Sequence, residues 1–479
     1  MKRVFIGVIA IMMANNAHAA STEKMETPPW PAEPPATWLT YHLVHPGPGN
    51  AMPGDPNPAF YYKGRYHLHY IYKNDTGFVF GHVSSTDMVH WKWHPTVLGP
   101  KTTGHGMYSG TGFFTPDGRP AMVYHGEGSN RNWILYGLDD DLNQWSQPQL
   151  MLPKDKDGQL MEDQAYFDPD IWRDGETYYG LNGVSWKEPP QIMKSNNLTD
   201  WTFLGELLHP DFDEDRLGVK RSEDISCPNV FTLGDKWVLL CISHRLGCRY
   251  FIGDFKDEQY LPEHHAMMSW NGNHYFAPES FLTQDKRRVM LAWLINLPLS
   301  PTGVQSLPRE LELPKDGVLR IAPLRELEEL RYDKTCEKNI AVKANSTVAI
   351  GGVSSDAYEL ELKIDAPAAK AFGVDVLCDK HGHAGLRIGV NAESKTLQVG
   401  AVNAPFELAE GEALELRVFV DKNLVEVFAN GRQAALSALE MFTAKHVYAR
   451  LFTVGSDLHV DTVTTWKMKT IYDGEMGVD

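Results

Sequence analysis

The stretch PGDPNPAFYYKGRYHLHYIY, residues 53–72, predicts two apolar strands joined by a tight turn at KGR, residues 63–65. Polar turn residues between runs of aromatic and aliphatic residues are typical of a β-hairpin. The same order of turn and apolar strand returns four times along the chain, and these turns lie near Gly118, Gly175, Gly234 and Lys286. Repeats of roughly 50 to 60 residues are typical of a β-propeller that builds each unit as one four-stranded sheet. We therefore predict an all-β protein whose first domain is a five-bladed β-propeller.

A short segment precedes each of these turns, and most of these segments begin with a residue next to proline. The segments are DPNPAFYY (55–62), SGTGFF (109–114), DPDIW (168–172), CPNVF (227–231) and APESF (277–281). In a propeller they would form the innermost strands, so their first residues would meet at one mouth of the central axis. Asp and Pro are also common in plain turns. Two DP pairs at equivalent places in the repeat nevertheless favour a functional site that contains Asp55, Ser109 and Asp168.

The composition excludes several classes of protein. The chain has 479 residues, of which 43% are hydrophobic and 22% are charged, and this balance excludes disorder, coiled coils and collagen. The formal net charge of −17 and the lack of a basic run argue against a nucleic-acid partner. We expect no metal and no organic cofactor, because the sequence has neither a C-x-x-C pair nor an H-E-x-x-H motif.

The N-terminus has the pattern of a secretory signal peptide. Lys2 and Arg3 precede an apolar run, and Ala17-His18-Ala19 fits an A-x-A cleavage site. The apolar run is too short to span a bilayer, so we expect no membrane partner. We expect removal of residues 1–19 on export to the periplasm or the extracellular space. The Pro-rich residues 20–37 are expected to form an extended segment.

The pattern changes beyond the predicted propeller, which we place at residues 38–330. Alternating segments such as AYELELKID (357–365) and LVEVFAN (424–430) are separated by turn signals. Such strands are typical of a β-sandwich, which we place at residues 336–479. The five cysteines are too few and too unevenly numbered for a disulfide framework. Cys336 and Cys378 are left as one candidate disulfide pair.

Several strings, in order along nearly the whole mature chain, resemble motifs of glycoside hydrolase family 32, the β-fructosidases (invertases, inulinases and levanases). The strings are PGDPNPAFYY (53–62), GHVSSTDMVHW (81–91), YSG (108–110), FDPDIW (167–172), SCPNVF (226–231), HYFAPESF (274–281), SLPREL (306–311) and LRVFVDKNLVEVFANG (416–431). The resemblance implies a five-bladed propeller followed by a C-terminal β-sandwich, as the repeat count does independently. It also implies an oligosaccharide or polysaccharide substrate.

The resemblance assigns roles to the acidic residues. A retaining glycosidase needs a carboxylate nucleophile and a second group that acts as acid and then as base. Asp55 matches the family's nucleophile, which forms a covalent fructosyl-enzyme, and Asp168 matches the transition-state stabiliser. The family's Glu before Cys-Pro is Ser226 here, with Glu223 and Asp224 just upstream in RSEDISCP. Asp224 would share the face of Ser226 on an extended strand, whereas Glu223 has the longer reach. We favour Glu223 as the acid/base and keep Asp224 as its rival.

Other family positions around the sugar also differ. Gly54 stands where the family has Asn, Ile71 where it has Gln, Phe80 where it has Trp, and Phe167 where it has Arg. The lost hydrogen-bond donors weaken discrimination between sugar hydroxyls, which leaves the exact sugar open. The candidate sugar contacts are Phe80, Tyr108, Ser109, Phe167 and Asp224.

Three functions follow from these observations. The first is a retaining hydrolase that releases fructose from sucrose, inulin or levan. The second is a propeller glycosidase for a different sugar, such as an arabinosidase-like enzyme, and the missing Arg and Gln motivate it. The third is a carbohydrate-binding protein without turnover, which Ser226 motivates.

Overall fold

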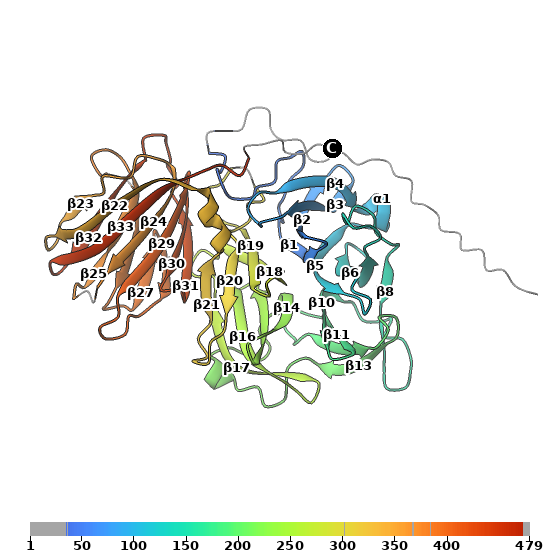
Figure 1. Cartoon of the computed structure of the whole chain (residues 1–479). Helices are drawn as coiled ribbons and strands as arrows, with labels where there is room; N and C mark the ends of the chain where they lie inside the picture. The colour runs from blue at the N-terminus through green and yellow to red at the C-terminus, as the bar shows by residue number, and fades with distance from the viewer. Residues whose placement is uncertain (1–34, 36, 301, 366–367, 384, 473–479) are drawn as a thin grey trace, which may run out of the picture.

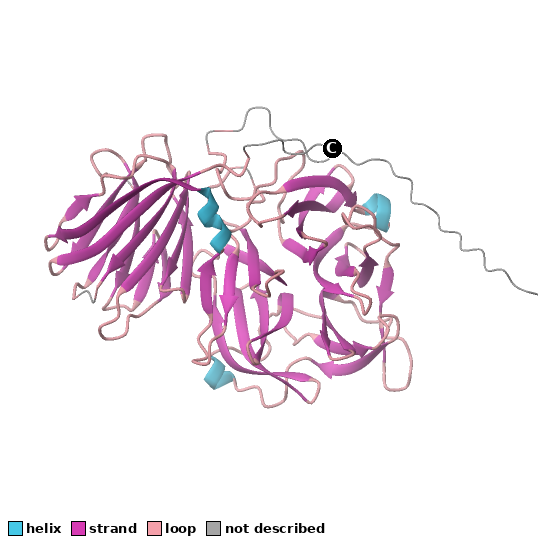
Figure 2. Cartoon of the chain, viewed as in Figure 1, coloured by secondary structure: helices cyan, strands magenta, loops and turns pink. Residues whose placement is uncertain are grey.

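The structure is a computed structural model that describes residues 35, 37–300, 302–365, 368–383 and 385–472. The predicted signal peptide (1–19) and nearly all of the Pro-rich segment (20–37) lie outside the described residues. Within the described part of the chain, no helix is long and apolar enough to cross a membrane. Strands dominate the two bodies seen in Figure 2, a ring of sheets and a layered pair of sheets.

The ring consists of sheets that follow one another along the chain, each antiparallel and named here as a blade (Figure 1). Blade 1 contains β1 (Pro56–Tyr62), β2 (Arg65–Asn74), β3 (Gly77–Ser85) and β4 (Lys92–Leu98). Blade 2 contains β5 (Met107–Phe114), β6 (Pro120–Gly126), β7 (Arg131–Tyr136) and β8 (Gln149–Met151). Blade 3 contains β10 (Phe167–Asp174), β11 (Thr177–Gly183), β12 (Gln191–Ser195) and β13 (Trp201–Glu206), with the short β9 (Pro153–Lys154) parallel to β13.

The remaining blades complete the ring. Blade 4 contains β14 (Ser226–Leu233), β15 (Lys236–Ser243), β16 (Gly247–Lys256) and β17 (Gln259–Met267). Blade 5 contains β18 (Tyr275–Leu282), β19 (Arg288–Leu294), β20 (Arg309–Glu312) and β21 (Arg320–Pro323). The short helices are α1 (Pro100–Thr103), α2 (Glu214–Leu217) and the 3-10 helix η1 (Arg325–Leu330).

The first strand of each blade lies at the centre of the ring. Neighbouring first strands contact one another in the order β1, β5, β10, β14 and β18, and β18 returns to β1. Each of them has a register shift close to its start, which falls between Asn57 and Ala59, Tyr108 and Gly110, Phe167 and Asp170, Ser226 and Asn229, and Phe276 and Glu279. A bulge of this kind bends a strand and redirects its side chains. The fold therefore brings the starts of the inner strands together at the axis, as predicted.

The second body is a β-sandwich, and it confirms the predicted fold class. One sheet has the order β22 (Arg331–Val342), β33 (Leu458–Met468), β24 (Ala357–Ile364), β29 (Leu414–Asp421), β30 (Leu424–Ala429) and β31 (Gln433–Ala438). The other has the order β23 (Thr347–Ala349), β32 (Tyr448–Val454), β25 (Ala371–Cys378), β26 (Leu386–Asn391), β27 (Thr396–Val399) and β28 (Val402–Pro405). Alternate side chains of both sheets fill one apolar core between them. The first sandwich strand starts at Arg331, ahead of the predicted boundary at 336.

The candidate disulfide between Cys336 and Cys378 does not form. Cys336 is exposed on β22, whereas Cys378 is buried at the end of β25 in the opposite sheet, and both are free thiols. The pattern of strands thus separates two residues that the sequence alone could not place.

A buried charged cluster joins the N-terminal segment and blade 5 to the sandwich. The His42 ring contacts Asp421 through Nδ1 (2.8 Å) and Glu426 through Nε2 (3.3 Å). Glu426 also accepts hydrogen bonds from the Leu307 backbone N–H (2.8 Å) and from Arg309 Nη2 (2.7 Å). Burial alone would lower the pKa of His42, but its hydrogen bonds with the two carboxylates raise the pKa to about 9. His42 is therefore a cation at neutral pH, and it neutralises carboxylates that have no access to water.

We expect His42→Ala to destabilise the protein by roughly 3 to 5 kcal/mol, because the substitution leaves the buried Asp421 carboxylate without its cation and removes one of the two cations beside Glu426. The pKa of His42 is raised in the folded state, so the stabilisation is complete below the unfolded-state pKa of about 6.5 and is lost as pH rises through about 9. Denaturation followed at pH 6, 8 and 10 should show a loss of stability in the wild type that His42→Ala lacks. His90→Ala is the control, since the His90–Asp87 pair is half exposed and its loss should cost less than about 1 kcal/mol. Equal destabilisation by both substitutions would contradict the proposed importance of burial.

Candidate active site

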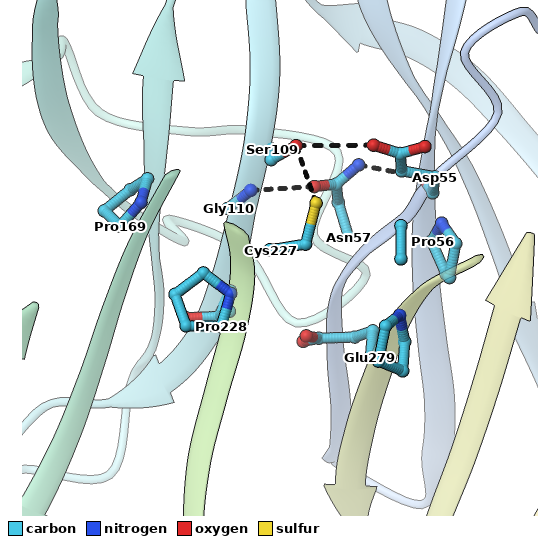
Figure 3. Close-up of a pocket in the computed structure, with 12 residues that line it drawn as sticks. Asp55, Pro56, Asn57, Ser109, Gly110, Pro169, Cys227, Pro228 and Glu279 are labelled. Atoms are coloured by element: carbon cyan, nitrogen blue, oxygen red, sulfur yellow. Dashed lines mark hydrogen bonds between the residues drawn. The ribbon is translucent and has the colours of Figure 1, made fainter. Parts of the chain in front are cut away.

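A pocket lies on the axis of the propeller, where the first strands of the blades begin (Figure 3). About 230 Å³ of space lies in it, part of which is open to solvent. Every blade contributes to its wall, through Asp55, Pro56, Asn57, Ser109, Gly110, Thr111, Pro169, Cys227, Pro228, Ala277, Pro278 and Glu279. Residues from positions 55 to 279 therefore meet in one concave site, which is the usual form of a small-molecule site.

Asp55 stands directly before β1 and its side chain is buried. Its Oδ2 accepts a hydrogen bond from Ser109 Oγ (3.3 Å), whereas its Oδ1 has no hydrogen-bond partner among the described residues. Asn57 holds the local backbone, because its Nδ2 donates to the Asp55 carbonyl (2.8 Å) and its Oδ1 accepts from the Gly110 N–H (2.8 Å). Figure 3 shows these contacts linking β1 to β5. One oxygen of the carboxylate is thus held in place, and the other is buried without a hydrogen-bond partner among the described residues.

Asp168 faces the same site from blade 3. Its Oδ2 accepts a hydrogen bond from the Cys227 backbone N–H (2.9 Å), which ties β10 to β14. Asp168 (φ 39°), Cys227 (φ 46°) and Ala277 (φ 48°) each adopt positive φ just before a proline. Side chains other than glycine rarely adopt this conformation, and it is retained here at equivalent positions of three blades. Such local strain is typical of functional sites.

The two aspartates influence each other's ionisation. Burial and the negative charge of Asp168 raise the pKa of Asp55 to about 7, while the hydrogen bond from Ser109 acts in the opposite direction. Burial also raises the pKa of Asp168, and the Cys227 N–H and the nearby His125 and His244 lower it. A neighbouring like charge disfavours the ionised form, so the charge of Asp168 helps to hold the pKa of Asp55 above its usual range.

Two side-chain contacts hold the carboxylate of Glu223. Its carboxylate accepts a hydrogen bond from Ser243 Oγ (2.6 Å) and forms an ion pair with Arg245. Burial would raise the pKa of Glu223, but these two contacts and the charge of Arg249 lower it. Both partners belong to the end of β15 and the loop after it, on either side of His244. The ion pair with Arg245 occupies the Glu223 carboxylate, and the choice of Glu223 as the acid/base stays a prediction.

Asp224, the rival, lies beside the pocket. Its charge contributes to the raised pKa values of Asp168 and Cys227. Asp224 Oδ1 accepts a hydrogen bond from Ser226 Oγ (2.6 Å). Its Oδ2 accepts from both the backbone N–H (2.8 Å) and ring Nδ1 (2.7 Å) of His244. Ser226 therefore supports a carboxylate two residues upstream, in place of the family's own Glu.

The predicted sugar contacts divide into two groups. Ser109 lines the pocket, Tyr108 and Phe167 are half-buried near it, and Asp224 lies beside it. Phe80 is fully buried instead, in the apolar core between blades 1 and 2. A side chain without exposed surface has no face to offer to a sugar, so packing is its role.

Trp293 explains the missing Asn before the nucleophile. A Cβ atom added at Gly54 would approach the Trp293 indole Nε1 to 3.0 Å and the Ala51 carbonyl oxygen to 2.8 Å. Gln305 Nε2 donates to the Gly54 carbonyl (2.7 Å) from the other side. The indole thus occupies the space that a larger side chain would need, and only glycine fits.

Buried acids that the sequence reasoning missed lie deeper on the axis. Asp170 accepts hydrogen bonds from Thr111 Oγ1 (2.5 Å) and from the Val230 N–H (2.6 Å). Glu279 is buried, and burial together with the charge of Asp170 raises its pKa well above the usual value. Arg288 is the cation that acts on both. The signal was their position in the segments DPDIW and APESF, where each acid stands two residues after the first residue and directly after the proline.

Comparisons with known proteins agree with this architecture. Residues 45–323 match the model of the glycosyl hydrolases family 32 N-terminal domain, and residues 326–467 match that of the family 32 C terminal. The chain belongs to glycosyl hydrolase family 32. It is 25% identical to a sucrose-6-phosphate hydrolase of Escherichia coli, over 83% of this chain and 88% of the relative. It is also 25% identical to a levanase of Bacillus subtilis, over 97% of this chain and 74% of the relative.

Solved structures share the fold of this family 32 chain. The fructan 1-exohydrolase IIa of Cichorium intybus superposes with a TM-score of 0.76 at 18% identity, over 91% of this chain and 98% of that one. An exo-inulinase of Aspergillus awamori superposes with a TM-score of 0.73 at 19% identity, over 92% of this chain and 99% of that one. The predicted family and architecture are both confirmed.

We expect Ser109→Ala to raise the pKa of Asp55 above about 7, because the variant loses the hydrogen bond that favours the ionised carboxylate. Asp168→Asn should shift it the opposite way, since it removes the like charge. Carbon NMR of labelled aspartates, assigned with Asp55→Asn, measures both shifts. Ser129→Ala is the control, because that hydroxyl donates to the Gly126 carbonyl in a turn of blade 2 and should leave the pKa of Asp55 unchanged. Shifts of the same sign in Ser109→Ala and Asp168→Asn would contradict this account of the site.

Proposed function

We propose that this family 32 protein is a retaining glycoside hydrolase that releases fructose from β-fructofuranosides. The observation that carries the proposal is the convergence of Asp55 and Asp168 on one axial pocket. Paired carboxyl groups in a concave site are what glycoside hydrolysis needs. The named activities of the relatives, a levanase and sucrose-6-phosphate hydrolases, support the same class of substrate.

The chemistry follows from the carboxylate of Asp55. The Asp55 carboxylate attacks the anomeric carbon C2 of the fructosyl unit, and the hydrogen bond from Ser109 orients it. Asp168 binds sugar hydroxyls and stabilises the positive charge that develops on the ring. A proton donor on the Asp224 side of the pocket protonates the leaving oxygen. Water then hydrolyses the covalent fructosyl-enzyme, so the configuration at C2 is retained.

The position of the pocket on the propeller axis supports action at chain ends. Walls from every blade surround it, and this geometry suits a single terminal sugar ring better than the middle of a polymer. Ile71 and Phe80, where the family has Gln and Trp, are fully buried, so neither contributes a polar contact to the sugar. Recognition therefore depends on Asp55, Asp168 and the neighbouring backbone, and we propose exo-acting release of terminal fructose.

Location completes the proposal. The signal-peptide pattern of residues 1–19 supports export, where unphosphorylated oligosaccharides and fructans are the accessible substrates. The acidic net charge of −17 suits a neutral sugar better than an anionic one.

We expect Asp55→Asn to lower kcat on sucrose and inulin by roughly 10⁴-fold or more, because a nucleophile acts as part of a unit and its loss removes most of the catalysis. The variant should keep the wild-type melting profile, since Oδ1 has no hydrogen-bond partner among the described residues. Proton NMR of the first product of the wild type should show β-fructofuranose. Full activity of Asp55→Asn, or an inverted first product, would contradict the proposed mechanism.

Glu223→Gln and Asp224→Asn separate the two upstream acids. We expect Asp224→Asn to lower kcat/KM at least about 10²-fold, since Asp224 lies beside the pocket and holds His244. Glu223→Gln should remain within about tenfold of the wild type, because the ion pair with Arg245 occupies the Glu223 carboxylate. The rate of fructose release from 1-kestose measures kcat/KM for both variants. An inactive Glu223→Gln variant with normal folding would restore Glu223 as the acid.

A further inference from the structure

The carboxylate of Asp224 is poorly suited to give up a proton. Three donors surround it, namely Ser226 Oγ, the His244 backbone N–H and His244 Nδ1. Burial would raise the pKa of Asp224, but these hydrogen bonds lower it. A carboxylate that accepts several hydrogen bonds is stabilised in its ionised form. The acid that the reaction needs must therefore be another group on the same side of the pocket.

His244 is that group by position. It follows the last residue of β15, and Asp224 holds only one of its ring nitrogens, Nδ1 (2.7 Å). Its side chain is 49% exposed. Within the described part of the chain, the other ring nitrogen, Nε2, makes no hydrogen bond. The ring thus has one nitrogen fixed by a carboxylate, while about half of the side chain remains open to solvent.

Two aromatic rings set the orientation of this imidazole. Trp186, in the loop between β11 and β12, lies 4.9 Å from the His244 ring centre at an interplanar angle of 35°. Phe276 of β18 lies edge-on at 6.3 Å. Trp186 is 63% exposed, so the imidazole sits between an exposed aromatic wall and the acidic pocket.

We propose that the imidazolium of His244 is the proton donor of this enzyme and that Asp224 is its positioning residue; this rests on the proposed fructoside hydrolysis. As the Asp55 carboxylate forms its bond to C2, the C2–O bond breaks and its electron pair goes to the leaving oxygen. That oxygen takes the proton from His244 Nε2. In the second step the neutral Nε2 takes a proton from water, whose oxygen bonds to C2, and the Asp55–C2 bond breaks to restore the carboxylate.

The charges around His244 favour this role. The groups that face it are Asp224 beside β14, Asp168 of β10 and Asp55 before β1, together with the uncharged Trp186 and Phe276. The hydrogen bond to Asp224 raises the pKa of His244 above its usual 6.5, with further contributions from the charges of Asp224, Asp168 and Asp55. The adjacent Arg245 is paired with Glu223. These interactions therefore favour the protonated, proton-donating form of His244.

The test compares substrates whose leaving groups differ in their need for a proton. We expect His244→Gln to lower kcat/KM for sucrose and 1-kestose by about 10²- to 10⁴-fold, the usual contribution of general acid catalysis. For β-fructofuranosyl fluoride, whose leaving group needs no proton, the loss should be less than about tenfold. His90→Gln is the matched control: His90 Nδ1 contacts Asp87 at 2.8 Å with 48% of its side chain exposed, and its kcat/KM should stay within about twofold.

The pH profile distinguishes His244 from Asp224 as the donor. His244→Gln should lose the alkaline limb of kcat/KM, and Asp224→Asn should move that limb to lower pH, because the histidine loses the hydrogen bond that raises its pKa. The shift of the alkaline limb of kcat/KM in Asp224→Asn tests the role of His244 even if the His244→Gln variant folds poorly. An unchanged alkaline limb in either variant, or an equal loss on sucrose and on the fluoride in His244→Gln, would overturn the inference. Failure of the wild type to release fructose from any of these substrates would instead refute the proposed function.

Discussion

Closure of the propeller ring is the constraint on which the site depends. The first strands of the blades pack around a common axis, and each begins with a bulge beside the pocket. Proline after the pocket residue removes a backbone donor and fixes φ, so the regular ladder starts only beyond it. The residue before proline is thereby released from the sheet and turned toward the axis. Asp55, Asp168 and Cys227 meet for this reason, although long stretches of chain separate them.

Hydrogen bonds between blades convert that convergence into a defined geometry. Asn57 connects the start of β1 to Gly110 of β5, and Asp168 connects β10 to the Cys227 backbone of β14. Deeper on the axis, Asp170 continues the same pattern through Thr111 and Val230. Buried polar groups that are paired in this way restrict the blades to one register. The reacting carboxylates are consequently positioned by the backbone of their neighbours rather than by flexible side chains.

Much of this arrangement could be predicted from the sequence, because repeats and turns are local patterns. The spacing of the KGR-type turns was sufficient for the propeller, and the DP pairs were sufficient to place Asp55 and Asp168 near the same pocket. The sequence was not sufficient to choose between Glu223 and Asp224. That choice depends on Arg245, a residue of another turn that forms an ion pair with Glu223. Phe80 was misplaced for a similar reason, because alternation along a strand does not say which face meets the next blade. His244 carried no signal of its own: a lone histidine acquires its role only beside Asp224.

The buried cluster at the domain junction has a consequence for how such proteins change over time. His42 and Arg309 belong to the N-terminal segment and to blade 5, while their counter-ions Asp421 and Glu426 belong to the sandwich. Recombination that exchanged the C-terminal domain alone would leave two cations without anions in a dry interface, at a cost of several kcal/mol. The two domains are therefore expected to be inherited together, as a single unit of selection.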